Sequence, residues 1–463
     1  MKAKRLLALL PFVLAIPALS GCGNDGKIHV TFWHTMGKEL QANPLDYIIK
    51  EFEAANPNVK IDHTQKGGYD DIYENISQAI PAGTTPIMAY CYPDHVADYN
   101  TSKACLDLTQ FINDPELGFS EEDGPISDII EAYWKEGQEY LDDGIYSVPH
   151  CKSTEMIFYN KNVFDAKGWT IPDTWEGLEK LFEVIVADPD YAGKEGFVPF
   201  GYDSDANFFI TMCEQYGIPY TSLDKANGKG SADFNNPAAK NMVKKLNEWY
   251  TKGYLKTQGT SGGAYTSTQF SEGKLLITVG STGGTKYNYN ENFETAVAQM
   301  PHPSNDPALP RFDFFAGTDV TPLEGANNNH IIMQGPSICF FKKGTQEQKV
   351  AAWKFYKYLI KTMNSAAWSV ESGYSAVRLS SFSCDKMTSY LTDDTVTGKY
   401  TLIQKTLSVY TELSQRYFVS PAFPGSTTCR TEVDGILSNV FMGTKTLDKA
   451  FADAQAKATF AIQ

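Results

Sequence analysis

Polar side chains separate two apolar runs in the middle of the chain. The runs span residues 145–148 and 156–159, are rich in Ile, Val, Phe and Tyr, and predict buried strands. Ser153 and Thr154 lie between them. A hydroxyl pair between two core strands indicates that the chain crosses an open surface there. Because binding groups are often carried by such connections, we expect ligand contacts at this crossing.

Two patterns that could support catalysis or hold a metal do not fit their surroundings. Residues 259–263 match the GxSxG pattern of a nucleophile elbow, but the preceding stretch is short and polar rather than a core strand. Asp203, Asp205 and Asn207 have the spacing of a calcium loop, yet Phe208 stands where its turn needs glycine, so a helix N-terminus is the better interpretation. No HExxH, P-loop, GxGxxG or CxxC motif occurs. The sequence therefore predicts no enzyme, no metal site and no cofactor.

The elements that position any binding group begin with a regular alternation. Strands are predicted at 28–33, 59–64 and 87–92, and helices at 45–55 and 70–80. This β-α-β-α-β order predicts an α/β lobe with a mainly parallel sheet. Ligands of such sheets gather at the carboxyl ends of the strands.

A second alternation follows, and 463 residues are enough for two cores. The predicted architecture is two α/β lobes joined by crossings near 150–156, 298–303 and 374–380. The remaining predicted elements are helices at 160–167, 174–187, 206–216, 237–252, 346–361, 399–416 and 430–441, strands at 197–200 and 275–279, and an apolar run at 331–341.

The first residues predict an export signal rather than structure. Three basic residues precede an apolar stretch that is too short and too interrupted by proline to span a bilayer, so residues 1–21 are interpreted as a signal peptide. The sequence Leu-Ser-Gly-Cys ending at Cys22 resembles a bacterial lipobox. We expect lipidation of Cys22, a flexible tether over 22–27 and attachment to a membrane surface outside the cytoplasm.

The charge and cysteine content limit the partners. Loss of the three basic residues of the signal peptide takes the formal charge from −15 to −18, and no basic run is present, so nucleic acid is an improbable partner. Any recognition of an anion must therefore be local. Of the eight cysteines, seven remain besides Cys22, an odd number at irregular spacings whose pairing the sequence leaves open.

Several segments together resemble one protein family. The string YNKNVF, followed by a glycine and PDTWEGLEKL, covers residues 159–181, and supporting segments run from FWHTMGKEL (32–40) to GTKTLDKA (443–450). These resemble the family-one extracellular solute-binding proteins, the maltose-binding-like receptors of ABC importers, and among them the glycerol-3-phosphate receptors of Ugp-type importers. The resemblance implies the two-lobe type II fold of periplasmic binding proteins, with each sheet flanked by helices and hinge crossings between the lobes.

The resemblance also implies positions for ligand contacts. By this resemblance, six residues correspond to ligand contacts. They are Tyr69 in a Lys-Gly-x-Tyr motif, Ser153 in a Ser-Thr pair, Ser281 at a Ser-rich strand end, Gly335 after an Ile-rich strand, Tyr374 in a Gly-Tyr pair and Arg430 before the C-terminal helices. Hydroxyls and glycine amides donate to phosphate oxygens, and an arginine supplies a charge-assisted fork.

Two departures from the receptor pattern affect the expected ligand. The glutamate that follows a tyrosine in those receptors is absent here, and Asp94 is the nearest substitute, beyond Tyr92 and Pro93. A tryptophan pair near position 206 is also absent. The ligand therefore stays open between a sugar, glycerol-3-phosphate and a glycerophosphodiester.

The expected function is capture of a small polyhydroxylated ligand between two lobes for transport, with the permease subunits of an ABC importer as partners. The expected lobes are 28–153 with 302–376, and 154–301 with 377–463, in a monomer. The alternatives are a secreted carbohydrate-active or phosphodiester-cleaving lipoprotein, and a sensor or adhesin with the same fold.

Overall fold

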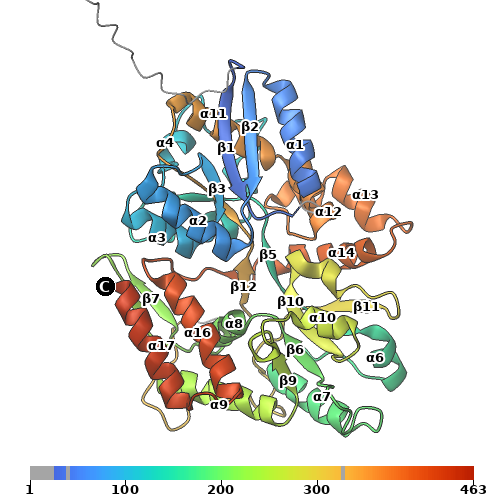
Figure 1. The fold of residues 1–463 in the computed structure, drawn as a ribbon. Coiled ribbons are helices and arrows are strands. Elements are labelled where there is room, and N and C mark those ends of the chain that lie inside the picture. The colour runs from blue at the N-terminus through green and yellow to red at the C-terminus, as the bar shows by residue number, and fades with distance from the viewer. Residues whose placement is uncertain (1–24, 38–41, 325–328) are drawn as a thin grey trace, which may run out of the picture.

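The computed structural model describes residues 25–37, 42–324 and 329–463. The signal peptide and Cys22 lie outside these residues. Within them, two main sheets occupy the upper and lower parts of the molecule, with helices packed around each (Figure 1). This arrangement confirms the predicted two-lobe α/β fold.

The first sheet has the strand order β2-β1-β3-β13-β4. The pairs of β1 with β2 and β3 are parallel, and the two pairs that involve β13 are antiparallel. Its strands are β1 (Ile28–His34), β2 (Val59–Gln65), β3 (Met88–Cys91), β4 (Ser147–Pro149) and β13 (Ser337–Phe340). Its main helices are α1 (Ala42–Ala55), α2 (Tyr69–Ala82), α3 (Pro93–Thr101), α4 (Thr109–Ile112), α5 (Glu131–Glu136), α11 (Gln346–Leu359) and α12 (Thr362–Ser372).

The second sheet is built around β5 (Ser153–Asn160), which pairs antiparallel with β10, β11 and β12. The other strands are β6 (Phe200–Tyr202), β9 (Leu255–Thr257), β10 (Ile277–Ser281), β11 (Thr295–Ala298), β12 (Ile331–Gln334) and β14 (Tyr417–Phe418), while β7 (Thr221–Asp224) and β8 (Lys229–Ala232) form a separate hairpin. The helices of this half are α6 (Lys161–Lys167), α7 (Trp175–Ala187), α8 (Asp205–Tyr216), α9 (Pro237–Thr251), α10 (Thr266–Ser271), α13 (Asp385–Thr392), α14 (Lys399–Leu407), α15 (Tyr410–Leu413), α16 (Ser426–Phe441) and α17 (Leu447–Ile462).

Local sequence signals place several helices where they were predicted. The side chain of Asn160 caps α6 by accepting a bond from the amide of Val163 (3.1 Å), and Thr174 caps α7 in the same way through Gly177 (3.2 Å). Such caps satisfy amides that have no partner inside the helix. The predicted helix at 399–416 is instead divided into α14 and α15.

The predicted run at 331–341 is two strands that belong to different sheets. Gly335 separates them, with φ of +83°, a backbone conformation that favours glycine. β12 pairs with β5 and β14 in the second sheet, whereas β13 pairs with β3 and β4 in the first. The chain therefore passes between the sheets at 335–336 rather than near 298–303. The lobe limits stay a prediction, and the strand pairing favours placing β12 with the second lobe.

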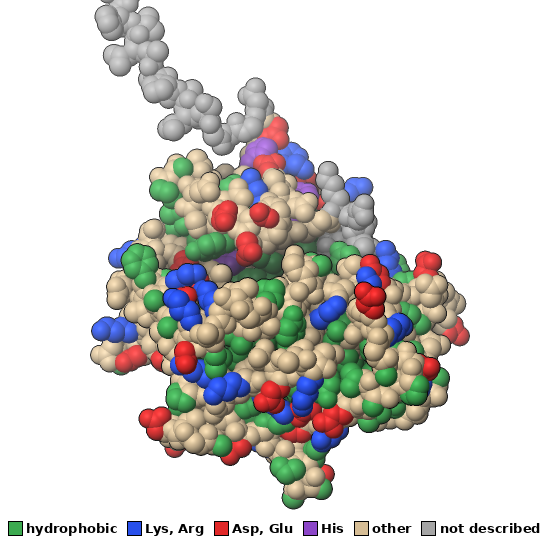
Figure 2. Space-filling model, turned by 60° about the horizontal axis from the view of Figure 1, so that its bottom comes forward, with side chains coloured by type: hydrophobic (Ala, Val, Ile, Leu, Met, Phe, Trp, Pro, Cys, Tyr) green, Lys and Arg blue, Asp and Glu red, His purple; other side chains and the backbone are tan. Residues whose placement is uncertain are grey.

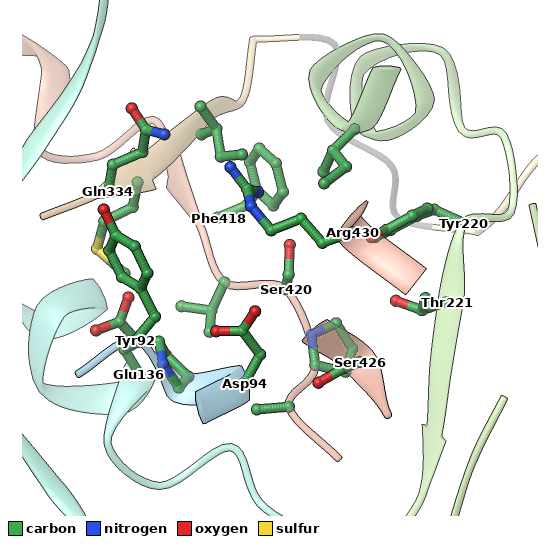
Figure 3. Close-up of a pocket in the computed structure, with 17 residues that line it drawn as sticks. Tyr92, Asp94, Glu136, Tyr220, Thr221, Gln334, Phe418, Ser420, Ser426 and Arg430 are labelled. Carbon is green, nitrogen blue, oxygen red and sulfur yellow. The ribbon is translucent and has the colours of Figure 1, made fainter. Parts of the chain in front are cut away.

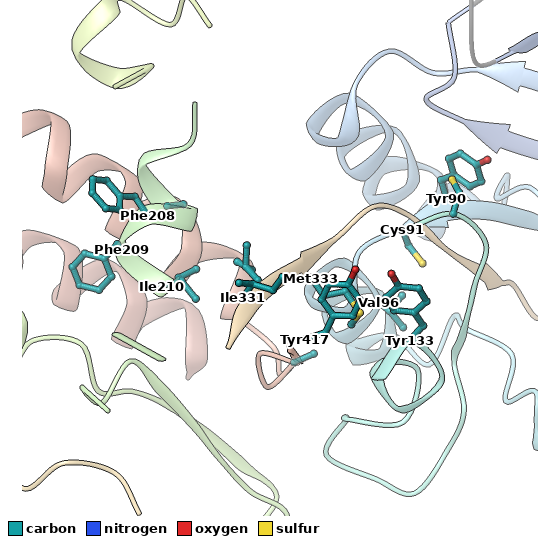
Figure 4. Close-up of a cluster of buried hydrophobic side chains, with 14 of the residues drawn as sticks. Tyr90, Cys91, Val96, Tyr133, Phe208, Phe209, Ile210, Ile331, Met333 and Tyr417 are labelled. Carbon is teal, nitrogen blue, oxygen red and sulfur yellow. The ribbon is translucent and has the colours of Figure 1, made fainter. Parts of the chain in front are cut away.

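A continuous hydrophobic core runs through both halves. Figure 4 shows Ile331 and Met333 of β12 between α8 on one side and Tyr90 and Cys91 of β3 on the other. Tyr133 stacks on Tyr417 at this junction, with ring centroids 5.3 Å apart. The junction between the sheets is thus well packed.

Two further observations concern the surface and the membrane. Acidic and basic side chains are interspersed over the face shown in Figure 2. None of the described helices is both long and apolar enough to cross a bilayer.

Candidate functional site

Three passes of the chain meet where the two sheets join. Lys152 and Ser375 bond to each other through both backbone amides, at 3.3 and 2.6 Å. A Cβ atom at Gly335 would lie 2.6 Å from the carbonyl oxygen of Cys151, so this glycine permits a close approach of two backbones. The passes at 150–153, 335–336 and 374–376 therefore form one bundle, which we call the hinge bundle.

The hinge bundle is buried, contrary to the expectation of an open surface at this crossing. All residues from 150 to 154 are at most 3% exposed. Ser153 and Thr154 already belong to β5, opposite Gln334 and Met333. The polar atoms of such a buried crossing need partners inside the protein, and the neighbouring passes supply several of them.

A cavity of about 90 Å³ lies beside the hinge bundle, between elements of both sheets. Two predicted ligand contacts line it: Asp94 projects from the first turn of α3, and Arg430 projects from α16 on the other side (Figure 3). The remaining wall consists of Tyr92, Pro93, Glu136, Ile210, Tyr220, Thr221, Ile332, Met333, Gln334, Phe418, Val419, Ser420, Pro421, Ala422 and Ser426.

Two other predicted contacts, Tyr69 and Tyr374, approach this cavity through a group of tyrosines. Tyr69 stacks on Tyr92, a cavity residue, with ring centroids 4.4 Å apart. Burial, with a smaller effect of the Tyr374 and Tyr92 hydroxyls, raises the pKa of Tyr69 well above its ordinary value. The Tyr69 hydroxyl is buried and makes no hydrogen bond of normal geometry among the described residues, although the side chains of Thr35 and Tyr374 lie beside it. Tyr69 itself is not among the described residues that line the cavity.

Three predicted contacts, Ser281, Ser153 and Gly335, have backbone or capping roles in this structure, and Tyr374 packs against a glycine. The hydroxyl of Ser281 accepts a bond from the amide of Gly283 (3.2 Å) at the start of the 3₁₀ helix Thr282–Asn288. The Tyr374 ring lies against Gly283, where a Cβ atom would be 2.6 Å from it. Ser153 and Gly335 lie in the hinge bundle. None of these four residues lines the cavity.

A buried network behind Arg430 was not predicted. Arg430 donates to the side-chain oxygen of Asn207, whose amide group donates to Glu155 (2.8 Å). Glu155 also accepts a bond from the Tyr202 hydroxyl. Burial raises the pKa of Glu155 to about 7, and the bonds from Tyr202 and Asn207 oppose this only in part. The sequence signal that could have revealed this network is the ionisable Glu155 inside the largely apolar strand STEMIFYN.

Glu136, which lines the cavity, was also missed by sequence reasoning. Its carboxylate pairs with the ammonium group of Lys152, whose side chain is fully buried. No pattern in the sequence links these two residues, because the pair forms only through the tertiary fold.

The two rejected motifs take structural roles. Asp203 accepts bonds from the amide and hydroxyl of Thr266 (2.6 and 2.7 Å), and Asp205 lies in the first turn of α8. Residues 259–261 form a short 3₁₀ turn. Within the described ranges, no group of three or more His, Cys, Asp or Glu side chains is arranged to hold a metal ion.

Comparison with known proteins gives one family and a consistent fold. The bacterial extracellular solute-binding protein family matches residues 47–392. The sn-glycerol-3-phosphate-binding periplasmic protein UgpB of Escherichia coli K12 is 25% identical over 363 residues, which cover 74% of this chain and 73% of that protein.

Two solved structures show the same fold at lower identity. UgpB of Mycobacterium tuberculosis in complex with glycerophosphocholine superimposes with a TM-score of 0.68 at 18% identity, covering 95% of this chain and 98% of that one. The GacH receptor of Streptomyces glaucescens, solved unliganded and with acarbose, gives a TM-score of 0.69 at 14% identity, covering 94% and 98%.

Proposed function

The chain belongs to the bacterial extracellular solute-binding proteins, and from this membership we propose that it is the receptor of an ABC importer. It captures a small polyhydroxylated ligand between its two lobes and presents it unchanged to the permease subunits. The lipobox supports attachment of the mature protein to a membrane surface outside the cytoplasm through Cys22. We propose that it acts there as a monomer.

The observation that carries this proposal is a cavity with walls from both halves of the molecule. Asp94 reaches it from the helices of the first sheet and Arg430 from those of the second. A ligand that contacts both residues gains more binding free energy when the lobes are closed than when they are open. Such differential contact shifts the equilibrium toward the closed state.

The size of the cavity implies that the lobes must part to admit a ligand. Its volume of about 90 Å³ is well below the ~300–1,000 Å³ typical of ligand pockets. The hinge bundle is the place where such an opening would be accommodated, because it contains the passes of the chain between the two sheets.

The charges around the cavity favour one ligand class. Among the described residues, Arg430 is the only arginine or lysine in the cavity wall, and the Asp94 carboxylate lies in the wall opposite. A phosphomonoester is mostly dianionic at neutral pH because its second pKa is about 6. A phosphodiester carries a single negative charge, which one guanidinium can balance. We therefore propose a glycerophosphodiester, with a neutral carbohydrate as the second candidate.

The relatives support a glycerol-phosphate compound, and one of the two supports the phosphodiester class. The E. coli relative is named for sn-glycerol-3-phosphate, and the M. tuberculosis structure holds glycerophosphocholine. The acarbose complex of the S. glaucescens receptor supports the carbohydrate alternative.

A thermal-shift and calorimetry panel tests the proposal with glycerophosphocholine, glycerol-3-phosphate, maltotriose and glucose. A ligand at 100 times its Kd stabilises the folded protein by about 2.7 kcal/mol, which raises Tm by several degrees. We expect glycerophosphocholine to give the largest rise. Arg430→Ala should abolish that rise and leave the circular dichroism spectrum unchanged.

Arg311→Ala is the matched control, because the Arg311 guanidinium lies over the ring of Tyr216, 4.7 Å from its centroid, and outside the cavity wall. It should keep the full response to the ligand. A response of Arg430→Ala equal to that of the control would remove Arg430 from the site and favour a neutral sugar. No response of the wild type to any of the four compounds would contradict the proposed ligand classes.

A further inference from the structure

The buried residue Lys152 connects all three passes of the hinge bundle through its backbone and its side chain. Its backbone is bonded in both directions to Ser375, which belongs to the third pass. Its ammonium group donates to the carbonyl oxygen of Gly335 (3.1 Å), in the second pass, and to Glu136. One residue of the first pass therefore holds the other two passes in place.

Glu136 joins this bundle to the cavity. It is the last residue of α5, and its Oε2 atom accepts bonds from Lys152 and from the hydroxyl of Ser337 (2.8 Å), the first residue of β13. The same side chain lines the cavity, next to Tyr92 in Figure 3. The Oε1 atom takes no part in these two bonds. One carboxylate thus belongs both to the cavity wall and to the hinge.

We infer that Glu136 couples the contents of the cavity to the hinge bundle, as a ligand contact on one side and the counter-ion of Lys152 on the other. The inference rests on the proposed function, because it assigns a regulatory role to a residue of the same site. A hydroxyl or cationic group of the ligand is the chemistry that Glu136 would accept, whereas the phosphate would be repelled by it and bind at Arg430.

The physical reason for the coupling is the sensitivity of a buried ion pair to its surroundings. A carboxylate and an ammonium group removed from water depend on each other, and on every further donor or acceptor, for their stability. A ligand donor at Glu136 adds a bond to this group only when the lobes are closed. The hinge bundle is then stabilised in the closed arrangement, because all three passes are bonded to Lys152.

A second, partly buried pair provides a matched control. Lys357 donates to Asp123 (2.7 Å) and to the carbonyl oxygen of Gly118 (2.8 Å), so it also joins one carboxylate and one glycine carbonyl. This pair is in the first lobe, away from both the cavity wall and the hinge bundle. Glu136→Gln and Asp123→Asn therefore remove the charge of similar pairs at two different places.

The test compares amide hydrogen exchange at Lys152 and Ser375 in the ligand-free wild type and the two variants, and then the Kd for glycerophosphocholine. In Glu136→Gln we expect exchange at both amides to be at least tenfold faster and the Kd at least tenfold higher. Asp123→Asn should match the wild type in both measurements. If Glu136→Gln does not fold, the double variant Lys152→Met/Glu136→Met, which has no unpaired charge, is measured in its place.

If the two amides of Glu136→Gln exchange as slowly as in the wild type, or if its Kd is unchanged, the coupling is overturned. Equally fast exchange at both amides in Asp123→Asn also overturns it, because the effect would then not be specific to the hinge. Failure of the wild type to bind glycerophosphocholine counts against the proposed ligand instead. In that case the exchange measurement, which needs no ligand, still decides whether Glu136 controls the hinge bundle.

Discussion

Two buried glutamates lie near the same crossing of the chain and are stabilised in different ways. Glu136 is 5% exposed and has a direct cationic partner, Lys152, in addition to the hydroxyl of Ser337. Glu155 is 2% exposed and is bonded to the neutral groups of Tyr202 and Asn207. Its nearest cation, Arg430, contacts it only through Asn207.

The difference shows that a buried carboxylate can be stabilised either by a cation or by neutral hydrogen-bond donors. Neutral donors offset only part of the free energy lost when a charge leaves water. Burial accordingly raises the pKa of Glu155 to about 7. Glu136 instead forms an ion pair, in which removal of either partner leaves an uncompensated charge. The same residue type therefore has a structural role on one side of the crossing and a pH-sensitive role on the other.

The largest expected effect comes from removing the cation of the first pair. Lys152→Met leaves the Glu136 carboxylate buried without its partner and should lower the free energy of unfolding by about 3–5 kcal/mol. The double variant Lys152→Met/Glu136→Met should recover most of this loss, because two apolar side chains can replace a buried pair. Denaturant unfolding of the three proteins measures both values. A loss below about 1 kcal/mol in the single variant would show that the pair is not a structural charge.

The second prediction concerns Glu155, whose replacement should stabilise the protein above pH 7 rather than destabilise it. Its pKa is about 7 in the folded protein, above the ordinary value of 4.5, so the folded state binds more protons than the unfolded state between these pH values. The contribution of Glu155 to stability therefore falls as pH rises from 4.5 to 7. The full loss is about 3 kcal/mol at most, since each pKa unit corresponds to about 1.4 kcal/mol.

Glu155→Gln isolates this effect from other carboxyl groups whose pKa is also raised, such as Asp205. The variant lacks the titrating group, so it should be more stable than the wild type above pH 7, and the difference should decrease toward pH 5. Thermal unfolding of both proteins from pH 5 to pH 8 gives the difference directly. A difference that does not change with pH would show that Glu155 does not titrate in this range.

Local signals explain how much of the fold could be predicted. The caps at Asn160 and Thr174 and the apolar periodicity of the first strands and helices are short-range features, and the corresponding elements were found. The run at 331–341 could not be resolved in this way. Periodicity shows that a segment is buried but not which sheet it joins, and only the close approach of Gly335 to Cys151 separates β12 from β13.

The candidate site, like the fold, could be predicted only in part. Asp94 and Arg430 could be proposed from a family resemblance, and both line the cavity. Glu136 and Lys152 are brought together by packing between α5 and the hinge bundle, which no spacing in the sequence encodes. The stretch 150–154 was expected to be open because it is polar. It is buried because neighbouring passes provide partners for its polar groups.

The smallest expected effect concerns a polar group that, unlike both glutamates, has no partner. The Tyr69 hydroxyl is buried without a hydrogen bond among the described residues. Burying an unbonded hydroxyl costs about 1–3 kcal/mol. Tyr69→Phe should therefore raise the stability of the ligand-free protein by about 1 kcal/mol. If the hydroxyl bonds to the ligand, the same change should weaken glycerophosphocholine binding about tenfold.

Tyr133→Phe separates these two effects. The Tyr133 hydroxyl also makes no hydrogen bond of normal geometry in the described structure, but its ring stacks on Tyr417, which does not line the cavity, whereas Tyr69 stacks on the cavity residue Tyr92. This variant should gain similar stability and keep the wild-type Kd. Thermal unfolding with and without glycerophosphocholine measures both quantities in both variants. An equal Kd in the two variants would mean that the Tyr69 hydroxyl does not contact the ligand, and that its burial without a partner is unrelated to binding.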